Sequence, residues 1–250
     1  MKPTERFSYR VENYIRYRPS YPPEVIELMR GEMNLNENSM VADVGSGTGI
    51  FSKLLLETGC TVYGVEPNEP MRRAGEEFLK EFPGFQSIDG SSEKTNLPNA
   101  SVDLITAAQA FHWFDQTKTK IEFQRIIKPN NYVALIWNDR QLDSTAFLRD
   151  YEELLLRYGT DYKEVRHDAV STHKIRGFFL EDFNESAFCN IQTVDFEGLK
   201  GRVLSSSYIP DVGHPHFGEM LLQLENIFER HQKSGAVEIL YNTRVFYGKF

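Results

Sequence analysis

The sequence lacks the features that mark disulfide-stabilised, metal-binding and membrane proteins. It contains only two cysteines, Cys60 and Cys189, and neither belongs to a C-x-x-C pair. A disulfide scaffold and a structural zinc site therefore lose their main support in the sequence. No run of apolar residues is long enough to cross a bilayer, and residues 1–10 contain no apolar signal segment. We expect a cytoplasmic protein that uses no metal ion and does not enter a membrane.

An excess of positive charge is also absent. The chain carries 28 Lys and Arg residues against 36 Asp and Glu residues, a formal net charge of −8. This balance disfavours nucleic acid or an anionic membrane as a partner, because both are held mainly by clustered basic side chains. With 40% hydrophobic and 26% charged residues over 250 positions, the composition is typical of one folded domain with an elaboration.

Apolar runs and helical periodicities alternate over the first half of the chain. The expected strands are four short apolar runs at 40–44, 61–65, 102–108 and 132–137. The expected helices lie between them at 48–58, 68–82 and 115–127, with Asn68 and Asp115 as capping residues. Strands separated by helices predict an α/β fold, with a mostly parallel sheet covered by helices on both faces.

The two ends of the chain depart from this alternation. Residues 1–34 are rich in tyrosine and arginine and are interrupted by prolines, with a helix expected over 24–30. Beyond residue 137 the expected elements are a helix over 144–158, a strand over 191–196, a helix over 217–231 and an extended segment over 237–246. We expect the two extended segments to pair antiparallel at the end of the sheet. Residues 160–186 have no clear pattern.

The most informative stretch lies at the first strand-to-helix junction, where Gly45, Gly47 and Gly49 form a G-x-G-x-G run. Glycines there let a ligand approach the backbone, and the following helix start presents free N–H groups. The spacing differs from the G-x-G-x-x-G fingerprint, which argues against a nicotinamide or flavin dinucleotide. Glu66 ends the second strand, where a carboxylate can accept hydrogen bonds from both hydroxyls of a ribose. The pattern predicts a site for an adenosine-containing ligand.

Several segments together resemble the motifs of class I S-adenosylmethionine-dependent methyltransferases. They are Asp43 to Gly49, Glu66-Pro67-Asn68 with Met71, and strand 102–108 followed by Gln109-Ala110-Phe111-His112-Trp113-Phe114. The segment Tyr17-Arg18-Pro19-Ser20-Tyr21-Pro22 is similar to the small-molecule branch that includes trans-aconitate methyltransferase-like proteins. The resemblance spans roughly residues 7–137. It implies a Rossmann-like, seven-stranded sheet whose last strand is antiparallel.

The resemblance also implies S-adenosylmethionine as the cofactor, S-adenosylhomocysteine as its product, and a set of contacts. The implied cofactor-binding residues are Asp43, Gly45, Ser46, Gly47, Gly49, Glu66, Pro67, Met71, Ser91, Ser92, Gln109, Ala110, Tyr17 and Arg18. Of these, Glu66 holds the ribose, Met71 packs near the adenine and Gln109 approaches the methionine. Many relatives have an acidic residue where this chain has Ser91. Whether a serine or the nearby Asp89 meets the adenine stays open at this point.

Candidate catalytic residues follow the fourth strand, where donor and acceptor have to meet. A sulfonium is already an activated leaving group, so a general base is needed only if the acceptor carries a proton. His112 is the candidate base, and a role in shaping the pocket beside Trp113 is the alternative. The expected substrate-pocket residues are Tyr14, Trp113, Phe114, Trp137 and Arg140. Core packing is the alternative for Trp137.

These expectations divide a single domain into four parts. They are an N-terminal lid at 1–34, a cofactor-binding core at 35–137, a helical substrate cover with one strand at 138–235, and a final strand at 236–250. In the lid, Arg18 can pair with the methionine carboxylate or with an acidic acceptor. The favoured function is methyl transfer to a small molecule, with a carboxylate as the preferred acceptor. A non-catalytic S-adenosylmethionine-sensing module and, less favoured, a nicotinamide-dependent oxidoreductase are the alternatives.

Overall fold

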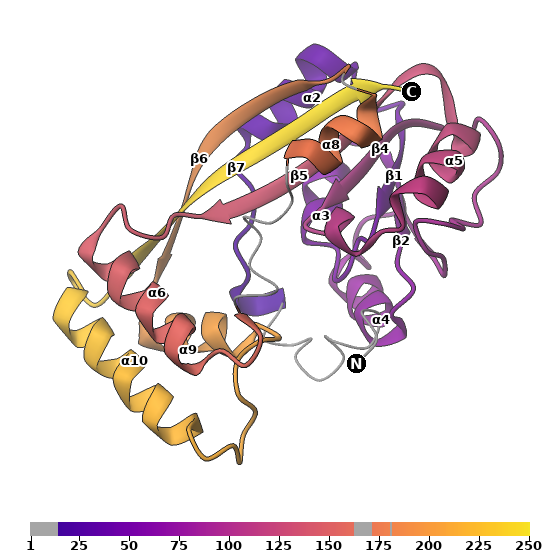
Figure 1. Ribbon diagram of the computed structural model, residues 1–250. Helices are drawn as coiled ribbons and strands as arrows, with labels where there is room; N and C mark the ends of the chain where they lie inside the picture. Colours follow the sequence, from indigo (N-terminus) through magenta and orange to yellow (C-terminus); the bar gives the residue numbers. More distant parts are fainter. Residues whose placement is uncertain (1–14, 163–171, 181) are drawn as a thin grey trace.

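The sheet has seven strands, and the first strand of the chain lies near its centre. The computed structural model describes residues 15–162, 172–180 and 182–250, and the strand order is β3-β2-β1-β4-β5-β7-β6 (Figure 1). The strands are β1 (Met40–Val44), β2 (Thr61–Val65), β3 (Phe85–Ile88), β4 (Val102–Ala108), β5 (Ile127–Arg140), β6 (Asn184–Val194) and β7 (Val237–Lys249). Strands β1 to β5 run parallel, whereas β7 runs antiparallel to both β5 and β6. The expected Rossmann-like sheet with an antiparallel last strand is confirmed.

The order of the strands reverses at β1. From β1 the chain adds β2 and β3 on one side and then crosses to place β4 on the other side. At such a reversal the loops that follow the two central strands leave on opposite faces, and a crevice opens between them at the carboxyl ends. The loop at 45–49 and the loop at 109–114 therefore border the same crevice.

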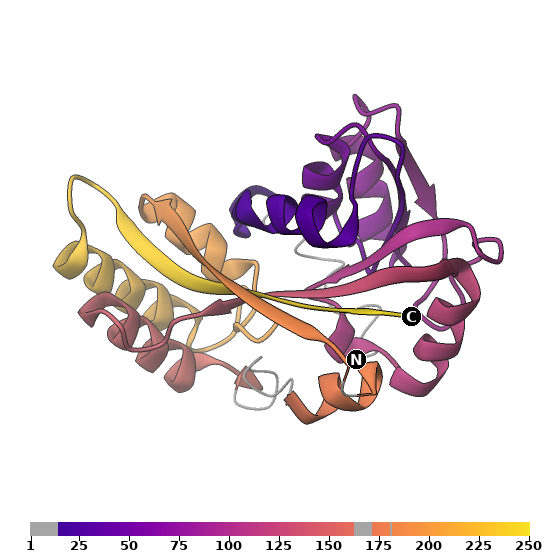
Figure 2. The same ribbon diagram turned by 90° about the horizontal axis from the view of Figure 1, so that it is seen from above.

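Helices cover both faces of the sheet, as Figure 2 shows. On one face, α2 (Glu24–Met33) and α3 (Ile50–Leu56) pack on the apolar side chains of the central strands. On the other face, α5 (Gln116–Ile126) and α8 (Thr172–Phe179) do the same. Alternate β5 residues serve the two layers, with Ala134 and Ile136 on the first face and Val133 and Leu135 on the second. The helix α4 (Glu69–Phe78) follows β2 and is capped by the side chain of Asn68, as expected.

A separate apolar cluster forms around the far ends of β5, β6 and β7, and we call it the cover lobe. Its helices are α6 (Ala146–Tyr158), α9 (Phe196–Leu204) and α10 (Phe217–His231), which Figure 2 shows gathered at one end of the long strands. The helix expected over 144–158 is present as α6, and its apolar side chains are buried, including Phe147, Tyr151 and Leu155. It packs with apolar residues of α9, α10 and the start of β7, so the lobe has a hydrophobic core of its own.

Residues 15–20 of the N-terminal flank lie between the sheet and the cover lobe. The side chain of Gln192 donates to the Tyr17 carbonyl at 2.9 Å, and the guanidinium of Arg18 donates to the Ser205 carbonyl at 3.0 Å. The Ser20 carbonyl accepts from the side-chain amides of Asn138 and Asn190. The described part of the flank is thus tied to both β6 and the end of α9.

The observed elements differ from the expected ones mainly at their ends. Helix α5 ends at Ile126 and β5 begins at once, because residues that precede Pro129 disfavour helical backbone. Strand β6 begins at Asn184, seven residues before the expected start. The sequence pattern did not predict these first residues as a strand, because they are mostly polar and lie on an edge strand with no fully buried position. Among the described residues, no helix is long and apolar enough to cross a membrane.

The packing of Tyr17 on α9 can be tested at Gly201. A Cβ added there comes within 2.2 Å of the Tyr17 ring, whereas one added at Gly218 in α10 meets nothing within 4 Å. Alanine favours a helix over glycine by about 1 kcal/mol, but overpacking costs typically about 1–3 kcal/mol. We expect Gly201→Ala to lower the free energy of unfolding in urea and Gly218→Ala to leave it unchanged or slightly raised. Equal or higher stability of Gly201→Ala would show that Tyr17 does not pack on this helix.

Candidate functional site

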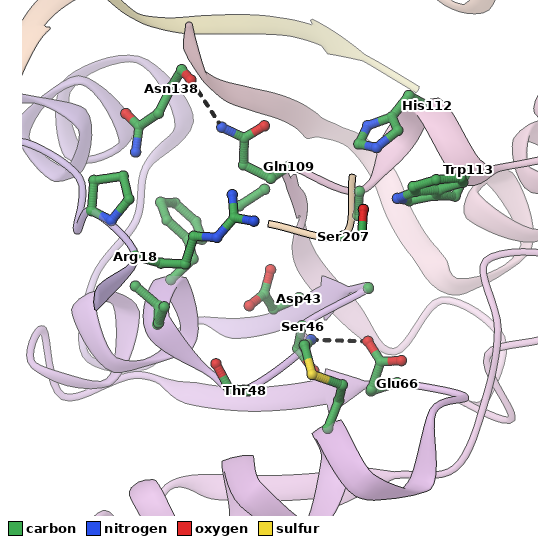
Figure 3. Close-up of a pocket in the computed structure, with 18 of the residues that line it drawn as sticks. Arg18, Asp43, Ser46, Thr48, Glu66, Gln109, His112, Trp113, Asn138 and Ser207 are labelled. Atoms are coloured by element: carbon green, nitrogen blue, oxygen red, sulfur yellow. Dashed lines mark hydrogen bonds between the residues drawn. The ribbon is translucent and has the colours of Figure 1, made fainter. Parts of the chain in front are cut away.

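A cavity of about 550 Å³ lies where the central strands face the cover lobe. The loops after β1, β2, β3 and β4 form one side, with Gly47, Glu66 and Gln109 among the lining residues. The other side is formed by Arg140, at the end of β5, and by residues of the cover lobe and of β7. Figure 3 shows Arg18 and Asp43 directed toward the same space, with His112 and Trp113 side by side at another part of the wall.

The turn after β1 is shaped by close approach to the loop after β4. Gly45 has φ +72°, and a Cβ at this position would come within 2.5 Å of the Ala110 Cβ. Gly47 has φ +57°, a left-handed backbone that glycine adopts without strain. The Gly45 N–H donates to the Val65 carbonyl at 2.8 Å, so the turn is also held against β2. Because Gly45 and Gly47 have no side chains, the backbone of the turn is exposed to the cavity.

Glu66 lies at the end of β2 and is pinned by two backbone N–H groups. Its carboxylate accepts from Gly47 N–H at 2.9 Å and from Asn68 N–H at 2.8 Å. Burial raises the pKa of the Glu66 carboxyl, and these two hydrogen bonds oppose the rise. A carboxylate with two oxygens has about four acceptor positions, so capacity remains for the hydroxyls of a ribose.

Asp43 is a buried carboxyl at the next-to-last position of β1, two residues before Gly45. Ser52 Oγ donates to it at 2.6 Å and Thr106 Oγ1 at 2.9 Å. Burial raises its pKa to about 6, because desolvation disfavours the charged form more than the two hydroxyls stabilise it. Asp43 therefore gains a proton near pH 6, and it carries a negative charge into the cavity at higher pH.

The loop after β4 brings a strained residue and two aromatic side chains to the cavity. Gln109 has φ +56°, which is uncommon for a residue with a side chain and is typical of functional sites. Its amide nitrogen donates to the Asn138 carbonyl at 3.1 Å. The turn η2 (Phe111–Trp113) follows, with Phe111 in the core and the rings of His112 and Trp113 centred 4.7 Å apart. The local geometry thus presents His112 and Trp113 together to the cavity.

The loop after β3 contributes polar side chains to the part of the cavity where the adenine is expected. Ser91, Ser92 and Glu93 line the cavity, whereas Asp89 is 76% exposed and pairs with Arg72 at 3.3 Å. The Glu93 carboxylate accepts from the Asp115 N–H at 3.1 Å. Burial acts to raise the pKa of Glu93, but hydrogen bonds from Ser91, Asp115 and Ser92 lower it overall. Glu93, which the sequence did not single out, is the acidic residue of this loop that reaches the cavity.

Basic side chains gather on the cover-lobe side. Arg140 pairs with Glu152 and donates to the Tyr162 hydroxyl at 2.9 Å. The other arginines that line the cavity are Arg18, Arg202 and Arg244. The carboxyl groups of the lining lie mostly on the opposite side. We call the half bordered by Asp43 and Glu66 the donor half, because the resemblance implies S-adenosylmethionine there, and the half bordered by arginines and tyrosines the acceptor half.

Most of the residues singled out from the sequence line this cavity. They are Asp43, Gly45, Ser46, Gly47, Glu66, Pro67, Met71, Ser91, Ser92, Gln109, Ala110, Arg18, His112, Trp113, Phe114 and Arg140. Gly49 caps α3 and Tyr17 packs on Gly201, and neither lines the cavity. The expectation for Trp137 as a pocket residue is wrong, because its side chain is 2% exposed and packs in the core against Phe111 and Phe246. Tyr14 lies outside the described residues.

Sequence reasoning missed the part of the wall that distant segments supply. These residues are Asn138, Asp139, Tyr162, Arg202, Ser207, Tyr208, Tyr241 and Arg244. They come from β5, α9, β7 and the segments that follow α6 and α9, so no local motif joins them. Within the described residues, no cluster of three or more His, Cys, Asp or Glu side chains could hold a metal ion.

The raised pKa of Asp43 predicts a specific dependence of stability on pH. Between pH 4 and 6 the folded protein keeps a proton on Asp43 that the unfolded chain has lost, so this group makes stability fall as pH rises. From pH 4.5 to 7 the loss amounts to about 2 kcal/mol. We expect urea unfolding of Asp43→Asn to lack this part of the decline, whereas Asp89→Asn at an exposed position keeps it. Parallel pH curves for the wild type and Asp43→Asn would contradict the assignment.

The donor half fits an adenosine ligand that carries a polar amino-acid tail. A bare glycine turn lies beside a buried carboxylate that retains free acceptor positions. Two further polar atoms in the wall, Thr48 Oγ1 and Gln109 Oε1, are buried and have no hydrogen-bond partner among the described residues. Buried polar atoms are normally satisfied, so unmet ones in a cavity wall indicate a ligand.

Several known proteins with similar sequences are named as methyltransferases. Residues 42–135 match the model of the methyltransferase domain family. An uncharacterized methyltransferase of Schizosaccharomyces pombe is 31% identical over 224 residues, which cover 89% of this chain and 87% of the relative. A second protein of that organism, named as methyltransferase-like, is 30% identical over 96% of this chain and 93% of its own length.

Solved structures with the same fold include proteins that are also named as methyltransferases. A candidate type II methyltransferase from Anaeromyxobacter dehalogenans superimposes with a TM-score of 0.67 at 19% identity, over 93% of this chain and 98% of that protein. An S-adenosylmethionine-dependent methyltransferase from Aquifex aeolicus gives a TM-score of 0.51 at 19% identity, over 78% and 93% of the two chains. At these identities the likeness concerns the fold, and the sequence relatives carry the family. The chain belongs to the class I S-adenosylmethionine-dependent methyltransferases.

Proposed function

We propose that this methyltransferase acts on a small molecule and transfers the methyl group to a carboxylate oxygen. The observation that carries the proposal is that the glycine turn with Glu66 and the arginine-rich wall border one continuous cavity. Its volume of about 550 Å³ lies in the range of pockets that hold a cofactor or metabolite. The net charge of −8 also speaks against a nucleic acid as acceptor.

Positioning is the main catalytic resource that these residues offer. S-adenosylmethionine supplies a methyl group on a sulfonium, which needs no further activation. The protein has to align the nucleophile and exclude water, and such alignment lowers a barrier by about 7–11 kcal/mol in favourable cases. Glu66 would hold the ribose, Gln109 and the turn at 45–47 would border the amino-acid end, and Trp113 would supply an apolar wall. Each of these groups is already fixed by the contacts described above.

A carboxylate acceptor suits the charges of the wall. It is ionised at neutral pH, so no base has to remove a proton before the methyl group is transferred. Arg18, from the flank, points into the cavity (Figure 3) and can attract a negative group or the methionine carboxylate. In this mechanism His112 shapes the space beside Trp113 and does not act as a general base.

The donor half can be tested at Glu66. Glu66→Ala removes the charge-assisted hydrogen bonds to the ribose, a loss of about 1.5–3 kcal/mol in binding free energy. We expect the dissociation constant of S-adenosylhomocysteine, measured by calorimetry, to rise about 10- to 100-fold. Asp89→Ala, which removes an exposed carboxylate from the next loop, serves as the control and should leave binding unchanged. Unchanged binding in both variants would remove Glu66 from the donor site.

The identity of the nucleophile can be tested at His112 once an acceptor is known. For a carboxylate acceptor, His112→Gln should reduce kcat less than about 10-fold and leave kcat/KM flat between about pH 7 and 9. For an acceptor that carries a proton, the same change should cost about 100-fold or more and remove an ionisation from the profile. Steady-state kinetics across this pH range decide between the two, and the second result would overturn the carboxylate proposal.

Methyl transfer itself requires a direct assay. The protein is incubated with methyl-labelled S-adenosylmethionine and pooled bacterial and yeast metabolites, and labelled products are identified by mass spectrometry. We expect a labelled methyl ester of a small acid. Donor binding without transfer to any compound would instead support the sensing-module alternative.

A further inference from the structure

Arg202 is a buried cation that has no carboxylate partner among the residues that the structure describes. It lies on α9, its side chain is 7% exposed, and it lines the cavity. Its Nε donates to the Tyr241 hydroxyl at 3.3 Å and its Nη1 donates to Ser206 Oγ at 3.1 Å. Within the described part of the chain, no Asp or Glu forms an ion pair with it. A guanidinium has five N–H donors, and these two hydroxyls use only two of them.

Two other arginines of the wall are neutralised within the protein. Arg140 pairs with Glu152, a residue that is itself buried. Arg244 pairs with Glu185 at 2.7 Å and lies 3.6 Å from Asp139. Both have a carboxylate to balance their charge, so neither has to find one in a ligand. Arg202 differs from them in this respect.

The surroundings of Arg202 hold its guanidinium in a fixed orientation. The Tyr241 hydroxyl that accepts from Arg202 donates in turn to Gln192 Oε1 at 3.1 Å. The Gln192 side chain then donates to the Tyr17 carbonyl. Hydrogen bonds that run in one direction along a chain strengthen one another. This chain fixes the orientation of the guanidinium, including its N–H groups that have no partner in the chain.

A purely structural role explains this arrangement poorly. Burying an unpaired charge costs several kcal/mol, and neutral hydroxyls compensate only part of that cost. An apolar side chain of similar length would link α9 to β7 without the penalty. The cost is offset when a ligand with a negative charge enters the cavity, because the planar fork of a guanidinium matches a carboxylate.

The chemistry of the wall favours a carboxylate over a phosphate as that ligand group. Arg202 brings one positive charge, which balances a single carboxylate, whereas a phosphate carries close to two negative charges at neutral pH. Tyr208 and Tyr241 also line the cavity, and Tyr208 packs on the Tyr162 ring with centroids 4.8 Å apart. Aromatic rings suit the carbon skeleton of an organic acid.

We propose that Arg202 recognises a carboxylate group of the methyl acceptor and so determines the specificity of the enzyme for organic acids. The inference rests on the proposed function, since it assumes that the cavity holds the acceptor together with the donor. It assigns the recognition to one residue of the cover lobe.

The first test distinguishes recognition of an acidic acceptor from methyl transfer to any acceptor. Pooled metabolite extract is divided on an anion exchanger into retained and unretained fractions, and each is incubated with methyl-labelled S-adenosylmethionine and the full chain. We expect label in a product from the retained fraction that mass spectrometry identifies as a carboxylic acid. Label only in unretained or phosphorylated compounds would overturn the role of Arg202 and leave methyl transfer intact. Absence of label from both fractions, despite donor binding, would overturn the proposed function and this inference with it.

Variants of α9 then assign the recognition to Arg202. Arg202→Met should lower the transfer rate at subsaturating acceptor by about 10-fold or more through a higher KM, with S-adenosylhomocysteine binding within about two-fold of wild type. Lys200→Met, on the same helix and paired with Glu197 at the surface, is the matched control and should keep the wild-type KM. Arg202→Lys keeps the charge without the planar fork and should recover part of the loss.

The two readouts exclude a structural explanation. If Arg202→Met does not fold, the proposal is tested with Arg202→Lys alone. A raised KM for the acceptor with unchanged S-adenosylhomocysteine binding in that variant supports recognition by Arg202. A wild-type KM in Arg202→Lys together with a wild-type KM in Arg202→Met would contradict the proposal. So would equal losses of donor and acceptor binding in either variant.

Discussion

The close contact between the loops after β1 and β4 is the constraint on which the site depends. A side chain at position 45 would come within 2.5 Å of the Ala110 Cβ, so only glycine permits the turn to lie this near. That proximity places the backbone of the turn, the carboxylate of Glu66 and the strained residue Gln109 around one space. The parallel pairing of β1 with β4 sets this distance before any ligand arrives.

The long antiparallel strands position the second wall of the cavity, which the central strands do not form. Because β5, β6 and β7 extend past the crevice, the helices of the cover lobe pack opposite the donor half instead of beneath the sheet. The lobe and the adjoining parts of β5 and β7 bring arginines and tyrosines, whereas the donor half brings Asp43 and Glu66. Flank residues such as Arg18 join the two by hydrogen bonds to the end of α9. The two halves of the cavity thus carry charged side chains of opposite sign.

The donor half could be predicted from the sequence because its parts are local. Glycine spacing, the end of a β-branched strand and a helix cap each leave a signature within a few residues, and Gly47, Glu66 and Asn68 were found in this way. The acceptor half has no such signature, because Arg202 and Tyr241 are 39 positions apart and meet only through the packing of α9 on β7. Trp137 was misplaced for a related reason. A strand end indicates the edge of a sheet, but it does not tell which face the side chain occupies.

A crystal structure of the chain with S-adenosylhomocysteine tests the central claim most directly. We expect the ribose hydroxyls within hydrogen-bonding distance of the Glu66 carboxylate, the adenine near Met71 and Glu93, and the sulfur facing the space between His112 and Arg202. Density for the ligand elsewhere, or a bound ligand whose sulfur is sealed off from the cover-lobe side, would contradict a single cavity shared by donor and acceptor.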